Sequence, residues 1–380
     1  MKTSNARSTG QIVEQRTAKV RTFMQEQGLD GILLRKRRSF AWLTGGRDNH
    51  IVNTSEEGVA DLLLLNDRLY CIASKMENAR IAEEELDGVA CDWVTPEWHE
   101  GHDAAIARLT EGLKIGTDVL PAMVGGLIDG VHLERPLAEL SYTLDDLEID
   151  AYRELAKQAA RAVESTCREI VPGMTEHQIH AHLAAKVIAQ GINPHVILVA
   201  TDERIFRYRH PIPTAKPLER YAMVVLCAER GGLIANVTRF VHFGPLSDEL
   251  QKNKQKLAEI DLAFNLSTRP GALIQDVLQQ GLDAYQSVGH ADDWKYLHQG
   301  GPTGYSTREF LATPGCEGVV RLHQAFAWNP AIRGIKSEDT ILVLEEHNEF
   351  LTHTGEWEYI IMEKNNQSHH RPDILIRSLE

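Results

Sequence analysis

The chain has 380 residues, of which 43% are hydrophobic and 25% charged, the composition of an ordinary globular protein. It carries 54 Asp and Glu against 40 Lys and Arg, a formal net charge of −14, so it lacks the positive field on which nucleic-acid binding depends. No apolar run approaches the roughly 18 residues of a membrane-spanning helix, and the opening segment MKTSNARSTGQIVEQR has no apolar stretch typical of a signal peptide. Five scattered cysteines without a CxxC pair argue against a disulfide framework. We therefore expect a soluble, cytoplasmic protein of two domains that binds neither nucleic acid nor membrane.

Helical and strand patterns alternate in the first third of the chain. Apolar residues recur at helical spacing over 12–28, and a short apolar run at 31–34 predicts a buried strand. Two further apolar runs, 60–65 and 69–73, are joined by Asn-Asp-Arg and predict a hairpin, and a charged helix is expected over 75–86. This alternation predicts a small α/β domain over residues 1–145.

The remainder of the chain, residues 146–380, predicts a second domain that mixes helices and strands. Thr175 is the expected N-cap of one of its helices. The predicted helices are 151–170, 176–190, 246–266 and 274–288, and the predicted strands are 195–200, 222–227, 233–243, 325–330, 339–345 and 357–362.

Polar residues of possible chemical use lie near the predicted strand ends of this second domain: His210, Asn236, Thr238, His298, Asn329 and Glu338. A histidine and a carboxylate brought together would make an acid/base pair. Taken one at a time, each residue also has an ordinary interpretation: a lone His beside Pro is usually a loop residue, and Glu338-Asp339 could be a solvated turn.

Taken together, these segments resemble the pita-bread family of methionine aminopeptidase, aminopeptidase P, prolidase and creatinase. The first domain is similar to the creatinase N-terminal domain in RTAKVRTFMQEQGLDGILLRKRRSFAWLTGG. The second follows the catalytic-domain order in VPGMTEHQI, HPIPT, ANVTRFVHFG, HQGGPTGY and AWNPAIRGIKSEDTILV. The resemblance implies an N-terminal creatinase-like α/β domain, a C-terminal pita-bread catalytic domain of the α+β type, and a homodimer.

The metal-ligand positions of this family are mostly changed. The resemblance implies two metal ions held by two Asp, one His and two Glu, and the corresponding residues here are Cys227, Asn236, Gly301, Asn329 and Glu338. Two divalent cations beside one carboxylate would be poorly neutralised, so we predict no metal ligands and no cofactor. The alternative is a weakly held manganese or zinc ion, with His298 replacing the lost histidine.

The pattern that remains is similar to that of creatinase, which lacks metals and cleaves an amidino C–N bond. The resemblance implies His210 as proton shuttle and Glu338 as the group that orients or activates water. The predicted substrate-binding residues are Asn236, Thr238, His298, Arg308, Asn329 and Cys227. Arg308 falls where the peptidases have a second His and could bind a substrate carboxylate or pair with Glu309. Cys227 could be a nucleophile or a buried packing residue.

The leading hypothesis is therefore a metal-independent hydrolase that cleaves an amide or amidino C–N bond in a small nitrogen compound. Two alternatives stay open: an Xaa-Pro-type aminopeptidase or dipeptidase with an atypical metal site, and a non-catalytic protein that binds peptides. The basic run Arg35 to Arg38 is expected to be a solvated strand end, with an anionic-substrate role as the other possibility.

Overall fold

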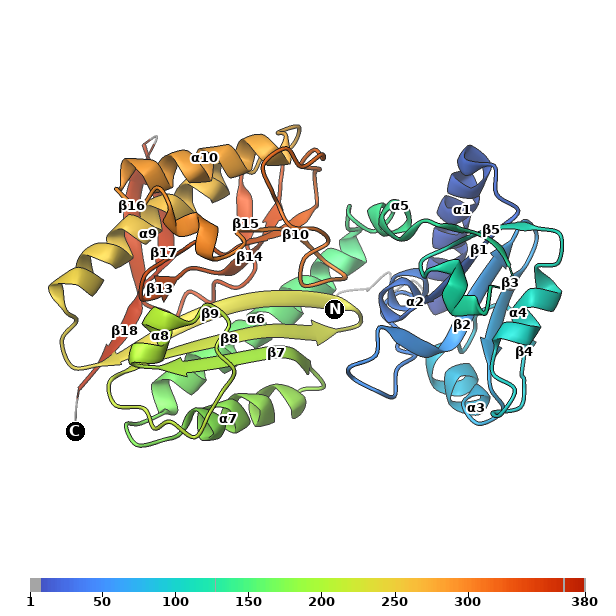
Figure 1. The fold of residues 1–380 in the computed structure, drawn as a ribbon, viewed down its shortest axis with the longest axis horizontal. Helices are drawn as coiled ribbons and strands as arrows, with labels where there is room; N and C mark the ends of the chain where they lie inside the picture. Colours follow the sequence, from blue (N-terminus) through green and yellow to red (C-terminus); the bar gives the residue numbers. More distant parts are fainter. Residues whose placement is uncertain (1–7, 127, 365, 379–380) are drawn as a thin grey trace, which may run out of the picture. The chain divides into compact units, whose positions relative to one another are not determined.

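The computed structural model describes residues 8–126, 128–364 and 366–378 (Figure 1). Residues 1–7, which open the segment judged to lack a signal peptide, lie outside the described residues. The chain divides into two compact units, Met1–Ser141 and Tyr142–Glu380. Within the part that the structure describes, no helix combines the length and apolar character needed to cross a membrane.

The first unit is built on one six-stranded mixed sheet with the order β4-β3-β2-β1-β5-β6. Its strands are β1 (Gly31–Lys36), β2 (Glu57–Leu65), β3 (Leu69–Ala73), β4 (Asp92–Val94), β5 (Lys114–Thr117) and β6 (Asp129–His132). Its helical segments are α1 (Thr9–Gln27), α2 (Arg37–Thr44), α3 (Asn78–Arg80), η1 (Ile81–Glu85), α4 (Asp103–Leu109), η2 (Pro121–Val124) and α5 (Glu134–Glu139). Leu33, Leu63, Ile72, Ile106 and Ile115 form part of its buried core. The predicted α/β character of this part of the chain is confirmed.

In this unit the hairpin of β2 and β3 follows the prediction, and the predicted charged helix does not. The predicted hairpin is present, because β2 and β3 pair antiparallel across the Asn-Asp-Arg turn. The predicted charged helix is instead a short α-helical turn that widens into the π-helical segment Ile81–Glu85. Its two buried apolar residues, Ile81 and Leu86, are five positions apart, and the bond from the Leu86 N–H to the Ile81 carbonyl brings both onto one face.

The basic run is not a solvated strand end. It spans the end of β1 and the start of α2, and the Arg35 side chain is only 13% exposed. Arg35 Nε lies 3.3 Å from the buried carboxylate of Asp61, and Lys36 Nζ lies 2.9 Å from Glu56. The expectation of solvation is therefore wrong for these two residues, because carboxylates far along the chain neutralise them.

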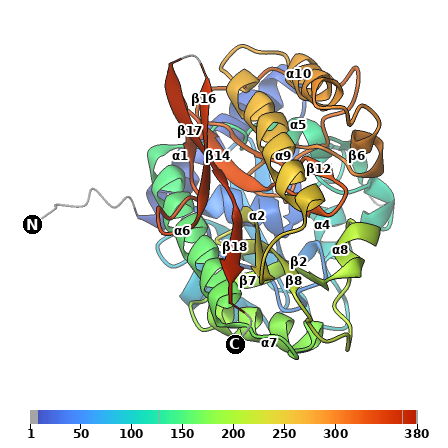
Figure 2. The same cartoon turned by 90° about the vertical axis from the view of Figure 1, so that its left-hand side faces the viewer.

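The second unit holds two four-stranded sheets with helices on both sides (Figures 1 and 2). One sheet has the order β18-β9-β8-β7 and the other β10-β11-β14-β15. Helices α6 (Asp146–Glu169) and α7 (Glu176–Ile188) cover the first sheet, and α9 (Asp248–Ser267) packs beside α10 (Ile274–Ser287). The other elements are β7 (Asn193–Thr201), α8 (Glu203–Arg207), β8 (Tyr221–Arg230), β9 (Leu233–Phe243), η3 (Asp293–Tyr296), β10 (Gly300–Thr303), β11 (Ala325–Trp328), β12 (Ala331–Ile332), β13 (Ile335–Lys336), β14 (Asp339–Val343), β15 (Asn348–Phe350), β16 (Tyr359–Lys364), β17 (Gln367–Pro372) and β18 (Ile374–Arg377).

The predicted elements of this unit are confirmed with small shifts of their ends. Strand β9 has the predicted bounds, and the predicted cap Thr175 accepts a hydrogen bond from the Gln178 N–H. Helix α6 begins five residues earlier than predicted, because Asp145 and Glu148 form a reciprocal capping box. The aromatic core residues Phe264, Phe326 and Trp328 stack between α9 and β11 and hold the helix layer on the second sheet.

Candidate active site

The polar residues predicted from the sequence lie where the two sheets of the second unit meet. Asn236 on β9 is directly opposite Cys227 on β8, and Thr238 follows on the same strand. The Thr238 N–H donates to the Glu338 carbonyl at 3.1 Å, and the Asn236 N–H donates to Thr340 Oγ1 at 2.7 Å. These bonds fix β9 against the start of β14 and place Glu338 beside Thr238.

Glu338 is the centre of this cluster. Its side chain is 6% exposed, with Oε1 2.9 Å from Arg308 Nη2 and Oε2 2.8 Å from Lys336 Nζ. Thr238 Oγ1 also donates to Oε2 at 2.8 Å. The alternative of a solvated turn at Glu338-Asp339 therefore does not hold, because both residues are buried. Arg308 pairs with Glu338 and not with Glu309, the alternative partner expected from the sequence.

Lys336 is a site residue that the sequence analysis missed. It lies two positions before Glu338, and its side chain is 7% exposed. In extended backbone, side chains two positions apart point to the same side, so Lys336 points to the same side as Glu338. That spacing was the signal that could have identified it.

Asn329 connects this charged cluster to the histidines. Its Oδ1 accepts a hydrogen bond from Arg308 Nη2 at 3.0 Å, and its Nδ2 donates to the His298 carbonyl at 3.1 Å. The His298 ring lies 5.7 Å from the His210 ring, centroid to centroid. The structure thus brings together most of the residues singled out from sequence motifs that lie up to 128 positions apart.

Burial favours the neutral form of both imidazoles. Burial, and then the positive charge of Arg308, lowers the pKa of His298 to about 4. Burial, followed by the charge of Lys336, also lowers the pKa of His210 below its ordinary value. His298 Nδ1 is buried and has no hydrogen-bond partner among the described residues. A neutral imidazole can accept a proton, so both rings are in the form that a general base requires.

Cys227 and Asn236 are both buried, and they differ in the chemical group that each presents to the site. Burial raises the pKa of the Cys227 thiol to about 12, so the thiolate needed for nucleophilic attack is not formed at neutral pH. Asn236 Nδ2 donates to Thr303 Oγ1 at 3.1 Å, while Asn236 Oδ1 is buried and unpaired within the described part of the chain. Asn236 therefore presents an acceptor, which suits a substrate N–H better than an oxyanion.

A buried carboxylate holds the segment that carries His210. Glu176, the first residue of α7, is fully buried. Its Oε2 accepts from the Thr214 N–H at 2.9 Å and from Thr214 Oγ1 at 2.7 Å, and its Oε1 accepts from the Thr201 N–H at 2.8 Å. Arg204 Nε lies 3.0 Å from the same carboxylate. The Glu176 side chain therefore joins the two sequence segments VPGMTEHQI and HPIPT, together with the bond from the His177 N–H to the Thr214 carbonyl at 3.0 Å.

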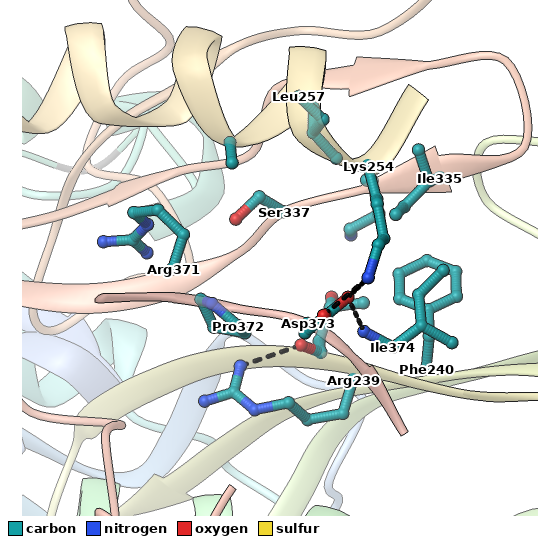
Figure 3. Close-up of a pocket in the computed structure, with 13 residues that line it drawn as sticks. Arg239, Phe240, Lys254, Leu257, Ile335, Ser337, Arg371, Pro372, Asp373 and Ile374 are labelled. Carbon is teal, nitrogen blue, oxygen red and sulfur yellow. Dashed lines mark hydrogen bonds and ion pairs between the residues drawn. The ribbon is translucent and has the colours of Figure 1, made fainter. Parts of the chain in front are cut away.

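A layer of buried ion pairs lies behind Glu338. Arg239 Nη2 is 2.9 Å and Arg371 Nη2 is 3.1 Å from the carboxylate of Asp339, the residue that follows Glu338. Figure 3 shows Arg239 and Arg371 in the wall of a cavity of about 20 Å³, close to the Lys254–Asp373 pair. Successive side chains of the strand thus point to opposite sides, Glu338 into the site and Asp339 into this layer.

The charge on Glu338 makes stability depend on pH. Burial alone would raise its pKa, but Lys336 and Arg308 outweigh burial and lower it from 4.5 to about 2. A carboxyl whose pKa is depressed in the folded state stabilises the fold above its unfolded pKa, and this contribution is lost as the pH falls from about 4.5 to 2. In urea unfolding, the stability difference between wild type and Glu338→Gln should shrink by roughly 3 kcal/mol between pH 6 and pH 2, at about 1.4 kcal/mol per pKa unit. A difference that does not change with pH would contradict this assignment.

The side chains at the five expected ligand positions do not fit a centre of two metal ions. Among the described residues, no group of three or more His, Cys, Asp and Glu side chains is arranged to hold a metal ion. The oxygens of Glu338 already face Arg308 and Lys336. A Cβ at Gly301, where the family pattern places its histidine, would lie 2.6 Å from the Phe310 carbonyl oxygen. No side chain fits at that position without movement of the backbone.

Comparison with known proteins identifies the family. Residues 150–345 match the model of metallopeptidase family M24, and residues 16–121 match the creatinase/prolidase N-terminal domain. An uncharacterized peptidase of Staphylococcus haemolyticus is 24% identical over 234 residues, which are 58% of this chain. The match spans 65% of that relative, just under two thirds of the relative's length. The probable dipeptidase PepE of Mycobacterium tuberculosis is 22% identical over 364 residues, 90% of this chain and 94% of its own. The Xaa-Pro dipeptidase from Bacillus anthracis has the same fold, with a TM-score of 0.76, 20% identity and coverage of 96% of this chain and all of its own.

These matches bear on four of the predictions. The resemblance to the creatinase, aminopeptidase P and prolidase group and the two-domain pita-bread fold are confirmed. The matched family is one of peptidases, in agreement with the prediction of a hydrolase acting on C–N bonds. The prediction of no cofactor is contradicted, because the matched family is one of metallopeptidases. The error arose because the changed ligand positions were given more weight than the family as a whole. The chain belongs to metallopeptidase family M24 and carries an N-terminal domain of the creatinase/prolidase type.

Proposed function

We propose that the protein is a peptidase of short peptides, of the Xaa-Pro dipeptidase type. The observation that carries this proposal is the placement of two neutral imidazoles beside the buried Arg308–Glu338 pair. The similarity to a probable dipeptidase along 90% of the chain and to the fold of an Xaa-Pro dipeptidase supports it. This reading replaces creatinase-like hydrolysis as the leading one, and the homodimer stays a prediction.

The site residues divide into proton transfer and substrate binding. His210 accepts a proton from the attacking water and returns it to the leaving nitrogen. The ring of His298, whose centroid lies 5.7 Å from that of His210, assists this proton transfer. Arg308 has a buried Nε with no hydrogen-bond partner among the described residues, and it binds the carboxylate of the substrate. Asn236 Oδ1 accepts the substrate N–H. Cys227 and Thr238 shape the pocket wall, and Thr238 also holds Glu338 by its hydroxyl.

Replacement of His210 tests the proposal directly. In an assay of proline release from Xaa-Pro dipeptides, with manganese or zinc supplied as the family implies, His210→Ala should lower kcat by about 100-fold or more with a small change in KM, because general acid–base transfer is lost. The matched control is His182→Ala, which removes an exposed histidine paired with Glu169 and should keep wild-type kcat. Turnover by the His210→Ala variant at the wild-type rate would contradict the assignment.

A second candidate is hydrolysis of an amide or amidino C–N bond in a small nitrogen compound. It is favoured by the two asparagines, Asn236 and Asn329, at positions where the peptidase pattern has carboxylates. The same preparation is assayed with guanidino and amide compounds. Turnover of these compounds that depends on His210, together with no release of proline from any dipeptide, would select this second function over the first.

A further inference from the structure

A second polar groove lies on the second unit, away from the residues of the candidate active site. It has a volume of about 510 Å³ and is formed by α9, the approach to η3 and the turn between β12 and β13. Its lining residues are Glu249, Lys252, Asn253, Lys256, His290, Asp293 and Arg333. None of the residues assigned to peptide hydrolysis is among them.

The charges in this groove follow one face of α9. Glu249, Lys252, Asn253 and Lys256 are spaced i, i+3, i+4 and i+7, so they share one side of the helix. Arg333 lies across from them, because Asn253 Nδ2 donates to its carbonyl at 3.4 Å. The groove thus has a carboxylate at the N-terminal end of the helix and cations in its middle.

The far end of the groove is closed by a hydrogen-bonded chain. Lys256 Nζ lies 3.3 Å from His290 Nε2, and His290 Nδ1 lies 3.0 Å from Asp293 Oδ2. The lysine donates to Nε2, so the proton of a neutral His290 is on Nδ1 and is donated to Asp293. The carboxylate of Asp293 is therefore satisfied within the protein.

The other charges of the groove have no such partners. Within the described ranges, Glu249, Lys252 and Arg333 form no ion pair. Unpaired cations are notable in a chain with a net charge of −14. A simple anion would meet repulsion from Glu249, and a simple cation would meet repulsion from Lys252 and Arg333. A ligand that carries both signs satisfies both.

We propose that this groove binds a small zwitterion of the amino-acid type. The carboxylate of the ligand is held by Arg333 and Lys252, and its ammonium group by Glu249. Glu249 and Lys252 are three residues apart and share one face of the helix, so opposite charges line the same side of the groove. This inference does not depend on the reaction at His210.

The test compares leucine with two analogues that each lack one charge, 4-methylpentanoate and isoamylamine, by isothermal titration calorimetry on the full chain. We expect leucine to bind, and both analogues to bind about tenfold more weakly or worse, because each loses one charge-assisted contact. Arg333→Gln and Glu249→Gln should each weaken leucine binding by about tenfold. The matched control Arg161→Gln, an exposed arginine paired with Glu356, should leave it unchanged.

The results that would overturn the proposal are distinct from those that bear on peptide hydrolysis. The groove is not a zwitterion site if leucine fails to bind up to its solubility limit, or if 4-methylpentanoate binds as tightly as leucine. Loss of leucine binding in Arg308→Ala, with retention in Arg333→Gln, would place the ligand in the candidate active site instead. The His210→Ala variant should lose hydrolysis and still bind leucine, so the two proposals fail independently.

Discussion

Replacement of Glu176 by Ala is expected to lower the free energy of unfolding by about 3–5 kcal/mol. The change removes the acceptor for the N–H and hydroxyl groups of Thr201 and Thr214 and leaves Arg204 without its buried partner. A buried donor without an acceptor costs the full penalty of its desolvation, so several small losses add at one place. Urea unfolding at pH 7 measures the effect, and amide hydrogen exchange of the segment 208–214 should accelerate in the native state.

The control for this result is Glu219→Ala. Glu219 belongs to the same region, but its side chain is 72% exposed and its ion pair with Lys216 is 3.5 Å long. Such exposed pairs contribute little, so the variant should stay within about 0.5 kcal/mol of wild type. If Glu176→Ala were no more destabilising than Glu219→Ala, the carboxylate would not be what holds the His210 segment.

Asp339→Asn is expected to destabilise the second unit to a similar degree, by about 3–5 kcal/mol. Burial alone would raise the pKa of Asp339, but Arg239 and His353 outweigh it and hold that pKa far below its ordinary value. The neutral amide leaves Arg239 with Glu164 at 3.6 Å and Arg371 with Asp261, and both guanidinium groups remain buried. Thermal and urea unfolding of the variant at pH 7 give the loss.

The matched control for this second variant is Asp283→Asn. Asp283 is exposed on α10 and accepts one hydrogen bond, from Gln279 Nε2, which an amide oxygen also accepts. A loss of less than about 1 kcal/mol in Asp339→Asn would show that the two arginines are balanced without it. The activity of the variant is a second measurement, because Glu338 directly precedes Asp339, the first residue of β14, and a tilt of that strand would move Glu338.

The sequence was sufficient to predict the order of the helices and strands and the site residues that lie in short motifs. Strand β9 and the β2–β3 hairpin follow from local apolar patterns, and such patterns depend only on neighbouring residues. His210, His298 and Glu338 were recognised from short segments that keep the family's order. Each of these signals is local in the chain.

The features that could not be predicted depend on contacts between residues far apart in the sequence. Lys336 is isolated in the sequence, and its importance comes from the carboxylate that it contacts inside the fold. A solvated turn was open as the ordinary interpretation of Glu338-Asp339, since nothing near it in the sequence indicates that Arg239, a hundred positions earlier, would neutralise Asp339. Desolvation and ion pairing are properties of the folded surroundings, so a carboxylate alone does not reveal whether it is exposed or buried.

The backbone around Gly301 restricts which residues this position can hold. A side chain at this position would collide with the main chain of Phe310 rather than with a flexible side chain. A histidine at this position therefore requires a coupled shift of the segment near Phe310, and the substitution Gly301→His alone should damage the fold. A ligand side chain cannot be introduced here by one exchange, because the obstacle is a neighbouring backbone and not the identity of residue 301.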